Sequence, residues 1–184
     1  MRKVVLYQLL SLDGVAEEPG DWFFDADEEV FANLGRVIGS QDAILLGRGT
    51  YDYWVGYWPG SDVEPFAGFI NGTRKHVVTS TPPAEEWANS TLVTEPVEQY
   101  VADLKREPGG DIGIHGSIRL ARSLLRARLV DELRLVVAPA IAGHGRRLFE
   151  DGDDLRRLEL LDARRTPSGS LLLGYRATGE GRPR

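Results

Sequence analysis

The order of apolar runs and helical patterns constrains the fold of this chain most strongly. Helical patterns at residues 28–38, 97–105 and 118–126 lie between short apolar or β-branched runs. Alternation of strand and helix is typical of a largely parallel sheet. The runs predict strands at residues 4–10, 43–46, 76–79, 112–114, 133–138, 158–161 and 171–175.

The region from Asp131 onward contains only strand patterns. Pro167-Ser168-Gly169 suits a hairpin turn between the last two runs, which predicts an antiparallel C-terminal edge. We therefore predict an α/β fold with one mixed, mostly parallel sheet and helices on both faces. A length of 184 residues with 42% apolar content suits a single domain, here 1–177, followed by a flexible tail at 178–184.

Charge and cysteine content exclude several classes of protein and site. The net charge of -6 opposes non-specific binding to nucleic acid or to an anionic membrane. The absence of cysteine excludes disulfides and thiolate metal sites, and the three histidines are too dispersed to predict a metal site. We find no signal-peptide pattern and no apolar stretch long enough to span a bilayer, so we expect a cytoplasmic protein.

Two glycine-bearing strand ends indicate a phosphorylated ligand. The first, Leu-Leu-Gly-Arg-Gly-Thr-Tyr at 45–51, offers Gly47, Arg48 and Thr50, whose N–H, guanidinium and hydroxyl groups can bind phosphate oxygens. Ligands of open α/β sheets sit beyond the carboxyl ends of the strands, where this motif falls. The alternative is a tight turn, in which Arg48 pairs with a surface carboxylate and Thr50 caps a helical turn.

The second glycine-bearing end, Gly-Ile-His-Gly-Ser at 113–117, leads directly into a predicted helix. A pyrophosphate there would meet Ser117 and the unpaired N–H groups of the first helical turn. Two such ends suggest an elongated ligand such as a dinucleotide. Neither G-x-G-x-x-G nor a G-x-x-x-x-G-K-[ST] loop is present, which argues against the common dinucleotide fold and against a P-loop.

A dense aromatic segment follows the first motif and suggests a place for a flat substrate. The segment contains Tyr51, Tyr53, Trp54, Tyr57 and Trp58. Trp22 with Phe24 could close the other side of a planar heterocycle. The alternative is that these rings pack the seam between helix and sheet, or a dimer contact.

Several short motifs, in this order along the chain, resemble the dihydrofolate-reductase superfamily. The resemblance is closest to the branch that contains the reductase domain of bifunctional riboflavin-biosynthesis deaminase-reductases, and it runs from Val4 to about Tyr175. The motifs are Ser11-Leu12-Asp13-Gly14, Leu46-Gly47-Arg48-Gly49-Thr50-Tyr51, Val78-Thr79-Ser80-Thr81, Gly116-Ser117 with Leu124-Leu125, the stretch 129–139, and Gly143-His144-Gly145-Arg146-Arg147-Leu148-Phe149.

This resemblance implies an NADPH-dependent reductase with a mixed eight-stranded sheet, often a homodimer. Gly47, Arg48 and Thr50 would line the phosphate side of the cofactor. The adenosine ribose and its 2′-phosphate would meet Thr79, Ser80 and Thr81, and the pyrophosphate would meet Gly116, Ser117 and Ile118. The alternative for 79–81 is a strand end that runs into the Pro82-Pro83 turn.

Two carboxylates are candidate catalytic residues. Dihydrofolate reductases of the ordinary kind use one near the start of the first helix. Any of the four carboxylates in 25–29 could point inward here, and Asp27 is the candidate. The alternative is that these acids only complement the helix dipole. Asp13, after the first strand, would lie near the nicotinamide and orient substrate, or Asp13-Gly14 is simply a turn pair.

The favoured function is an NADPH-dependent reductase that acts on a pterin- or aminopyrimidine-type heterocycle, similar to the reductase of riboflavin biosynthesis. The cysteine-ligated deaminase half of the bifunctional enzyme is missing. One alternative is an accessory dihydrofolate reductase or a general small-molecule reductase. Another is a non-catalytic nucleotide- or flavin-binding module.

Overall fold

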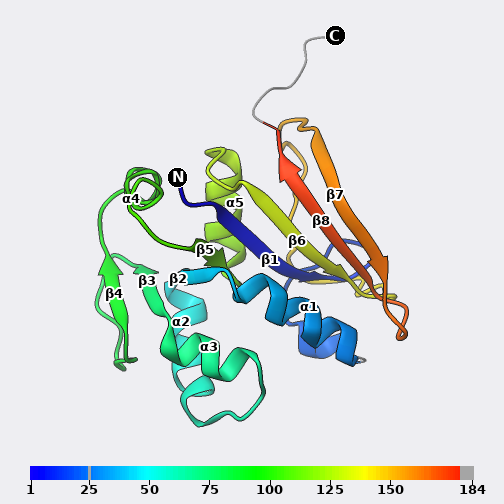
Figure 1. Ribbon diagram of the computed structural model, residues 1–184, viewed down its shortest axis with the longest axis horizontal. Helices are drawn as coiled ribbons and strands as arrows, with labels where there is room; N and C mark the ends of the chain where they lie inside the picture. The colour runs from blue at the N-terminus through cyan, green and yellow to red at the C-terminus, as the bar shows by residue number, and fades with distance from the viewer. Residues whose placement is uncertain (25, 179–184) are drawn as a thin grey trace.

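The computed structural model describes residues 1–24 and 26–178 and contains one eight-stranded sheet, shown in Figure 1. The strand order is β4-β3-β2-β5-β1-β6-β8-β7; β6, β8 and β7 pair antiparallel and the other neighbours pair parallel. The predicted fold class is thereby confirmed. The strands are β1 Val4–Leu10, β2 Gln41–Gly47, β3 Arg74–Val78, β4 Ser90–Val93, β5 Asp111–Ile114, β6 Glu132–Val137, β7 Leu158–Arg165 and β8 Leu171–Ala177.

Five helices connect the parallel strands. Three were predicted within a residue of their observed ends, whereas α2, α3 and strand β4 are absent from the predicted elements. Of the predicted tail, the part beyond Thr178 lies outside the described residues. Asp25 also lies outside them. The helices are α1 Glu28–Ile38, α2 Arg48–Val55, α3 Phe66–Gly72, α4 Val97–Leu104 and α5 Ile118–Arg126, with short 3-10 turns at Pro19–Asp21 and Trp58–Gly60.

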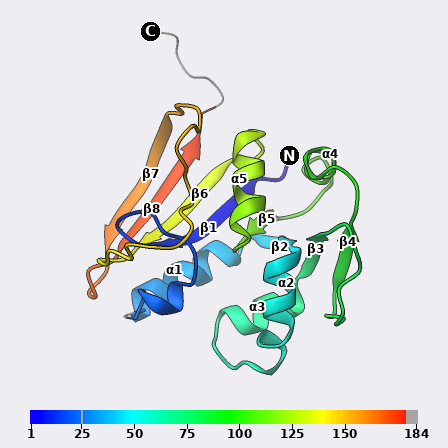
Figure 2. The same cartoon turned by 180° about the vertical axis from the view of Figure 1, so that it is seen from behind.

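Helices cover both faces of the sheet, and each face has its own apolar core. Seen from behind in Figure 2, α5 crosses β1 and β6, and its Leu124 packs with Leu6 and Leu133 in one core. On the face toward the viewer in Figure 1, α3 packs onto β2 through Phe66 and Ile70. The C-terminal ends of β3, β2 and β5 lie along one edge of the sheet, because these strands are parallel neighbours.

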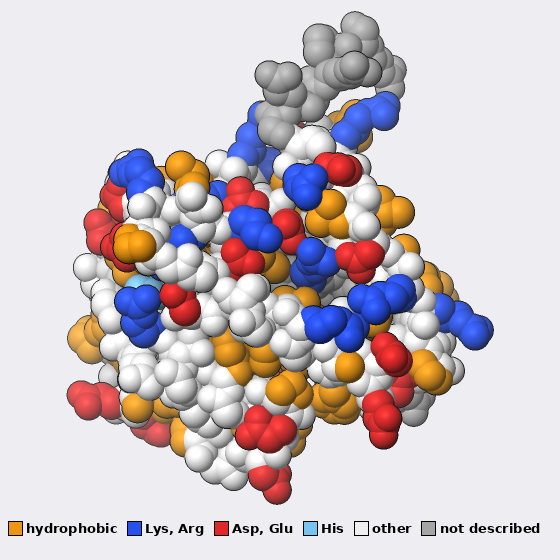
Figure 3. All heavy atoms as spheres, viewed as in Figure 1, with side chains coloured by type: hydrophobic (Ala, Val, Ile, Leu, Met, Phe, Trp, Pro, Cys, Tyr) orange, Lys and Arg blue, Asp and Glu red, His pale blue; other side chains and the backbone are white. Residues whose placement is uncertain are grey.

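The outer strands carry different side chains on their two faces. On the face of Figure 3, charged side chains of both signs intermix, and Arg134 pairs with both Glu132 and Asp162 at 2.7 Å. On the other face α5 does not extend over β7 (Figure 2), and Leu158, Leu160 and Leu171 are exposed. The predicted homodimer stays a prediction. Among the described residues no helix combines the length and apolarity that crossing a bilayer requires.

Candidate functional site

The two glycine-bearing strand ends meet at one point, at the carboxyl edge of β2 and β5. The Gly47 N–H donates to the Ser117 hydroxyl oxygen at 2.6 Å, and that hydroxyl donates to Thr50 Oγ1 at 2.9 Å. The meeting follows from topology, because β2 and β5 are parallel neighbours whose ends share an edge. The structure therefore places three of the predicted cofactor residues in direct contact.

Backbone shape at this junction requires glycine. A Cβ on Gly47 would clash with the Ser117 hydroxyl oxygen and would lie 3.0 Å from the Ser117 Cβ, tighter than an ordinary van der Waals contact. Gly116 has φ 152, and Ser117 itself is left-handed at φ 61. The chain thus turns sharply from β5 into α5, so that the first N–H groups of α5 face the edge of the sheet. Ile118 is buried, which leaves its backbone N–H as its only polar contribution.

Arg48 links the ends of β2 and β3. Its Nε donates to both carboxylate oxygens of Asp52 at 2.7 Å, and its Nη1 donates to the carbonyl oxygens of Thr81 and Pro82 at 2.8 and 3.0 Å. The carboxylate pairing agrees with the alternative interpretation of this motif. The guanidinium also lies beside the predicted ribose site, and the Arg48 side chain is 31% exposed, so it remains accessible to a ligand.

The segment 79–81 forms a compact turn beside that guanidinium. Thr79 is buried; its hydroxyl donates to the Thr81 carbonyl at 2.6 Å and accepts from the Thr81 N–H at 3.2 Å. Ser80 and Thr81 are exposed. The Thr81 hydroxyl accepts from Arg48 Nη1 at 3.1 Å, and the neighbouring Ser80 is open to solvent.

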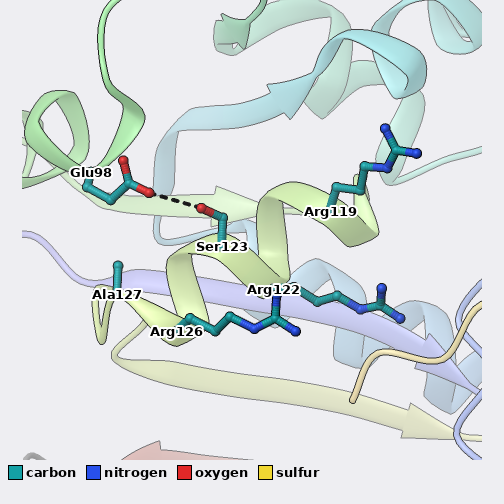
Figure 4. A pocket seen from close by; sticks show the side chains of 6 residues that line it. All are labelled: Glu98, Arg119, Arg122, Ser123, Arg126 and Ala127. Carbon is teal, nitrogen blue, oxygen red and sulfur yellow. Dashed lines mark hydrogen bonds between the residues drawn. The ribbon is translucent and has the colours of Figure 1, made fainter. Parts of the chain in front are cut away.

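A basic groove of about 350 Å³ lies along α5, and Figure 4 shows the side chains that line it. Arg119, Arg122 and Arg126 share one face of the helix, and the Ser123 hydroxyl donates to Glu98 of α4 at 3.0 Å. Carboxylates pair with Arg122 and Arg126, whereas no ion pair to Arg119 is found within the described part of the chain. The prediction missed this cluster, although the spacing 119, 122, 126 marks one helix face.

Tyr51 occupies a different environment from the one predicted. Its side chain is 1% exposed, and its hydroxyl accepts from the Trp87 N–H at 2.7 Å and donates to the Glu85 carbonyl at 3.0 Å. A ring enclosed in this way offers no free face to a planar ligand. We correct its assignment: Tyr51 belongs to the core, as the alternative had it.

The two tryptophans predicted to bind substrate belong to separate clusters. Trp54 is half-buried against Gly116, and its ring meets those of Phe66 and Trp58 edge-on at centroid distances of 5.6 and 6.0 Å. Trp22 is buried, donates from Nε1 to the Glu17 carbonyl at 2.9 Å, and lines a small acidic cavity of about 150 Å³. Only Trp54 therefore lies at the junction of the two motifs.

Asp13 joins the loop after β1 to the loop that follows β6. Its carboxylate accepts from the Ser11 hydroxyl at 2.6 Å and from the N–H groups of Ala142 and Gly143 at 2.9 and 3.0 Å. These donors, Ser11 above all, lower the pKa of Asp13 to about 2. A carboxylate so stabilised is ionised at neutral pH and is a poor proton donor.

Asp27 has a comparable arrangement at the start of α1. One oxygen caps the helix by accepting from the Val30 N–H at 3.1 Å, and the other accepts from the Ser168 N–H of the β7–β8 hairpin at 2.9 Å. The Ser168 N–H is the main cause that lowers the pKa of Asp27 to about 2. This carboxylate ties the hairpin to α1, which is a structural task.

The substitution Asp13→Asn is expected to remove an acid-sensitive part of the stability. The pKa lies below its ordinary 3.8, so the carboxylate stabilises the fold above about pH 4 and loses this effect as pH falls toward about 2. The measurement is the urea midpoint at about pH 5 and at about pH 3. Between these pH values the midpoint of the wild type should fall more than that of the variant. Asp62→Asn, in the exposed α2–α3 connection, is the control, and its urea midpoint should change with pH as that of the wild type does. If the midpoints of the wild type and Asp13→Asn change equally with pH, the ionised Asp13 carboxylate does not stabilise the fold.

Comparison with known proteins identifies relatives over nearly the whole chain. The family model described as RibD C-terminal domain matches residues 2–172. The uncharacterized protein YyaP of Bacillus subtilis (strain 168) is 28% identical over 184 residues, which covers 97% of this chain and 96% of that protein.

Two solved structures share the fold. A protein of Shewanella sp. PV-4 assigned to riboflavin biosynthesis has a TM-score of 0.78 at 17% identity and covers 96% of this chain and 99% of its own. The diaminohydroxyphosphoribosylaminopyrimidine deaminase/5-amino-6-(5-phosphoribosylamino)uracil reductase of Thermotoga maritima has a TM-score of 0.71 at 16% identity; the match covers 96% of this chain and 57% of that longer one.

Proposed function

This chain belongs to the RibD C-terminal domain family, and we propose on that premise that it is an NADPH-dependent reductase of a pterin- or aminopyrimidine-type heterocycle. The observation that carries the proposal is the junction of Gly47, Ser117 and Thr50, with Arg48 beside it. The Thermotoga maritima protein of the same fold is a reductase of 5-amino-6-(5-phosphoribosylamino)uracil, which supports this substrate class.

The residues at the junction fit a dinucleotide phosphate. Gly116, at φ 152, keeps the turn into α5 free of a side chain, so the backbone can approach an anion closely. Ser117 and the first N–H groups of α5 would hold the pyrophosphate. Arg48, with the exposed hydroxyls of Ser80 and Thr81, would hold the 2′-phosphate, and Arg119 adds positive charge at the start of α5.

The cofactor, when bound, supplies a hydride, and this chain supplies binding and orientation. Asp13 and Asp27 are held ionised at neutral pH, so we assign them to positioning rather than to proton donation. Asp13 fixes the loop after β1 against the loop that follows β6, and Asp27 fixes the β7–β8 hairpin against the start of α1. The proton required by a reduced heterocycle would then come from water.

A second candidate is a dinucleotide-binding protein without reductase activity. The observation that favours it is the same engagement of Asp13 and Asp27, because neither carboxyl remains as an acid at neutral pH. The two candidates differ in turnover. The reductase oxidises NADPH when supplied with dihydrofolate or 5-amino-6-(5-phosphoribosylamino)uracil, whereas the binding protein takes up NADPH and leaves its absorbance unchanged.

Arg48→Ala is expected to weaken NADPH binding and to leave NADH binding nearly unchanged. A charge-assisted contact to the 2′-phosphate contributes about 1.5–3 kcal/mol, so the Kd for NADPH should rise about tenfold or more. The measurement is a titration of NADPH and of NADH that follows the fluorescence of the four tryptophans.

Arg36→Ala is the matched control, since Arg36 is exposed in the last turn of α1, outside the proposed site. It should bind NADPH as the wild type does. Wild-type protein that binds neither cofactor, or an Arg48→Ala variant that still prefers NADPH, would refute the proposed cofactor site.

A further inference from the structure

A buried pair of polar side chains, one of which directly precedes Gly116, has no part in the cofactor proposal. His115 directly follows β5, and Gln41 is the first residue of β2; they are 9% and 8% exposed. His115 Nε2 lies 2.6 Å from Gln41 Oε1. The side chain of Gln41 reaches the histidine across Gly113, where a Cβ would lie 2.7 Å from Gln41 Cδ.

Each member of the pair retains one buried polar atom without a partner. These atoms are Nδ1 of His115 and Nε2 of Gln41, and no hydrogen bond to either is found within the described residues. Leaving a buried donor or acceptor unpaired costs about 1–3 kcal/mol, and here two such atoms belong to one pair. Two such atoms, one on each member of a hydrogen-bonded pair, point to a ligand that completes both.

The hydrogen bond between the two side chains determines whether each of their unpaired atoms is a donor or an acceptor. Gln41 Oε1 only accepts, so His115 Nε2 carries the hydrogen and donates. Burial lowers the pKa of His115 to about 3, which keeps the ring neutral. Nδ1 is then an acceptor and Gln41 Nε2 is a donor. Together they complement an adjacent N–H and C=O, the edge of a cyclic amide.

The surroundings of the pair suit a flat ring. Phe66, Phe69 and Tyr7 lie around His115 at centroid distances of 5.3, 5.5 and 5.7 Å. The Phe66 ring also packs edge-on against the Trp54 ring, which lies beside Gly116 of the junction. The aromatic rings therefore form a continuous path from the pair to the proposed cofactor residues.

We propose that His115 and Gln41 bind the cyclic-amide edge of the heterocyclic substrate. Nδ1 of His115 accepts from the ring N–H, and Nε2 of Gln41 donates to the neighbouring carbonyl oxygen. Phe66 and Phe69 of α3 cover the pair, so the ligand enters as α3 moves outward. The inference deepens the proposed function and rests on it, because it names what recognises the substrate at that site.

The first test measures the Kd of 5,6-diaminouracil, a flat pyrimidine with this edge, at saturating NADPH by tryptophan fluorescence. The double variant His115→Phe/Gln41→Leu removes both polar groups together and so leaves none unpaired. Its Kd for 5,6-diaminouracil should rise about tenfold or more, the loss of one to two neutral hydrogen bonds. Its Kd for NADPH should stay within about twofold of wild type.

His76 offers a matched control on β3. It is 7% exposed, its Nδ1 lies 2.6 Å from the Tyr100 hydroxyl, and its Nε2 also lacks a partner within the described residues. His76→Phe should leave the Kd of 5,6-diaminouracil unchanged. Equal losses in His76→Phe and the double variant would overturn the proposal, since they would reflect general loosening of the core.

Nitrogen-15 spectra of the imidazole rings give a readout that a purely structural role would not move. Adding 5,6-diaminouracil should shift His115 Nδ1 and leave His76 unaffected. Any of three results would overturn the inference: an unchanged nitrogen-15 shift of His115 Nδ1, an unchanged Kd in the double variant, or no binding of 5,6-diaminouracil by the wild type. The proposed function fails separately, on absent NADPH binding or absent NADPH oxidation.

Discussion

Replacing Lys75 by methionine is expected to lower the free energy of unfolding by about 3 kcal/mol, because three carbonyl groups lose their donor. Lys75 is fully buried, and its Nζ donates to the carbonyls of Ile70, Thr73 and Asn71 at 2.8, 2.9 and 3.4 Å. These carbonyls end α3, where a positive charge also complements the helix dipole. The ammonium lies 4.7 Å from the Trp87 ring centroid as well.

Urea denaturation near neutral pH measures this effect. Burial lowers the pKa of Lys75 to about 8, so the amine is still mainly protonated under those conditions. Lys3→Met is the control, because the Lys3 side chain is 48% exposed and its buried partner Glu132 keeps a second ion pair with Arg134, so the loss should be at most about 1 kcal/mol. Similar losses in the two variants would show that Lys75 does not hold the end of α3.

Gly47→Ala is expected to raise the Kd for NADPH about 30-fold, equivalent to about 2 kcal/mol. The new methyl group would meet the Ser117 hydroxyl and lie 3.0 Å from the Ser117 Cβ. Ser117 must then move, which breaks its bonds with the Gly47 N–H and Thr50. The residue that would hold the pyrophosphate is displaced.

Gly49→Ala is the matched control two residues away. A Cβ on Gly49 meets no atom within 4 Å, and alanine favours the helix in which Gly49 lies. Its NADPH affinity should equal that of wild type, and its unfolding midpoint should be equal or higher. If both variants bind NADPH normally, the close contact of Gly47 with Ser117 has no part in cofactor binding.

The predictable elements are those with a strong local pattern. Helix α1 combines a capping aspartate, Asp27, with amphipathic spacing, and its predicted and observed bounds agree. Helix α3 carries Gly68 and Gly72, which lower helix propensity, so no pattern marks it. Strand β4 is a short edge strand with an exposed Leu92, and it has no buried alternation to detect.

Contacts across the chain are the part that local patterns do not contain. The motifs predict that Gly47 and Ser117 lie at strand ends, but their direct bond depends on β2 and β5 being neighbours. Gln41 and His115 are 74 positions apart, and nothing near either residue announces the other. Tyr51 shows the converse failure, since an aromatic residue type suits a buried core and a stacking surface equally.

The pairing of Arg48 with Asp52 has a consequence for how any phosphate binds. Without a ligand, Asp52 already supplies the guanidinium with an anion, at 2.7 Å from Nε. Binding of a phosphate is then an exchange of one anion for another, and its affinity reflects the difference between them. The carboxylate also holds the arginine in a single orientation, so little side-chain freedom remains to be lost when the exchange occurs.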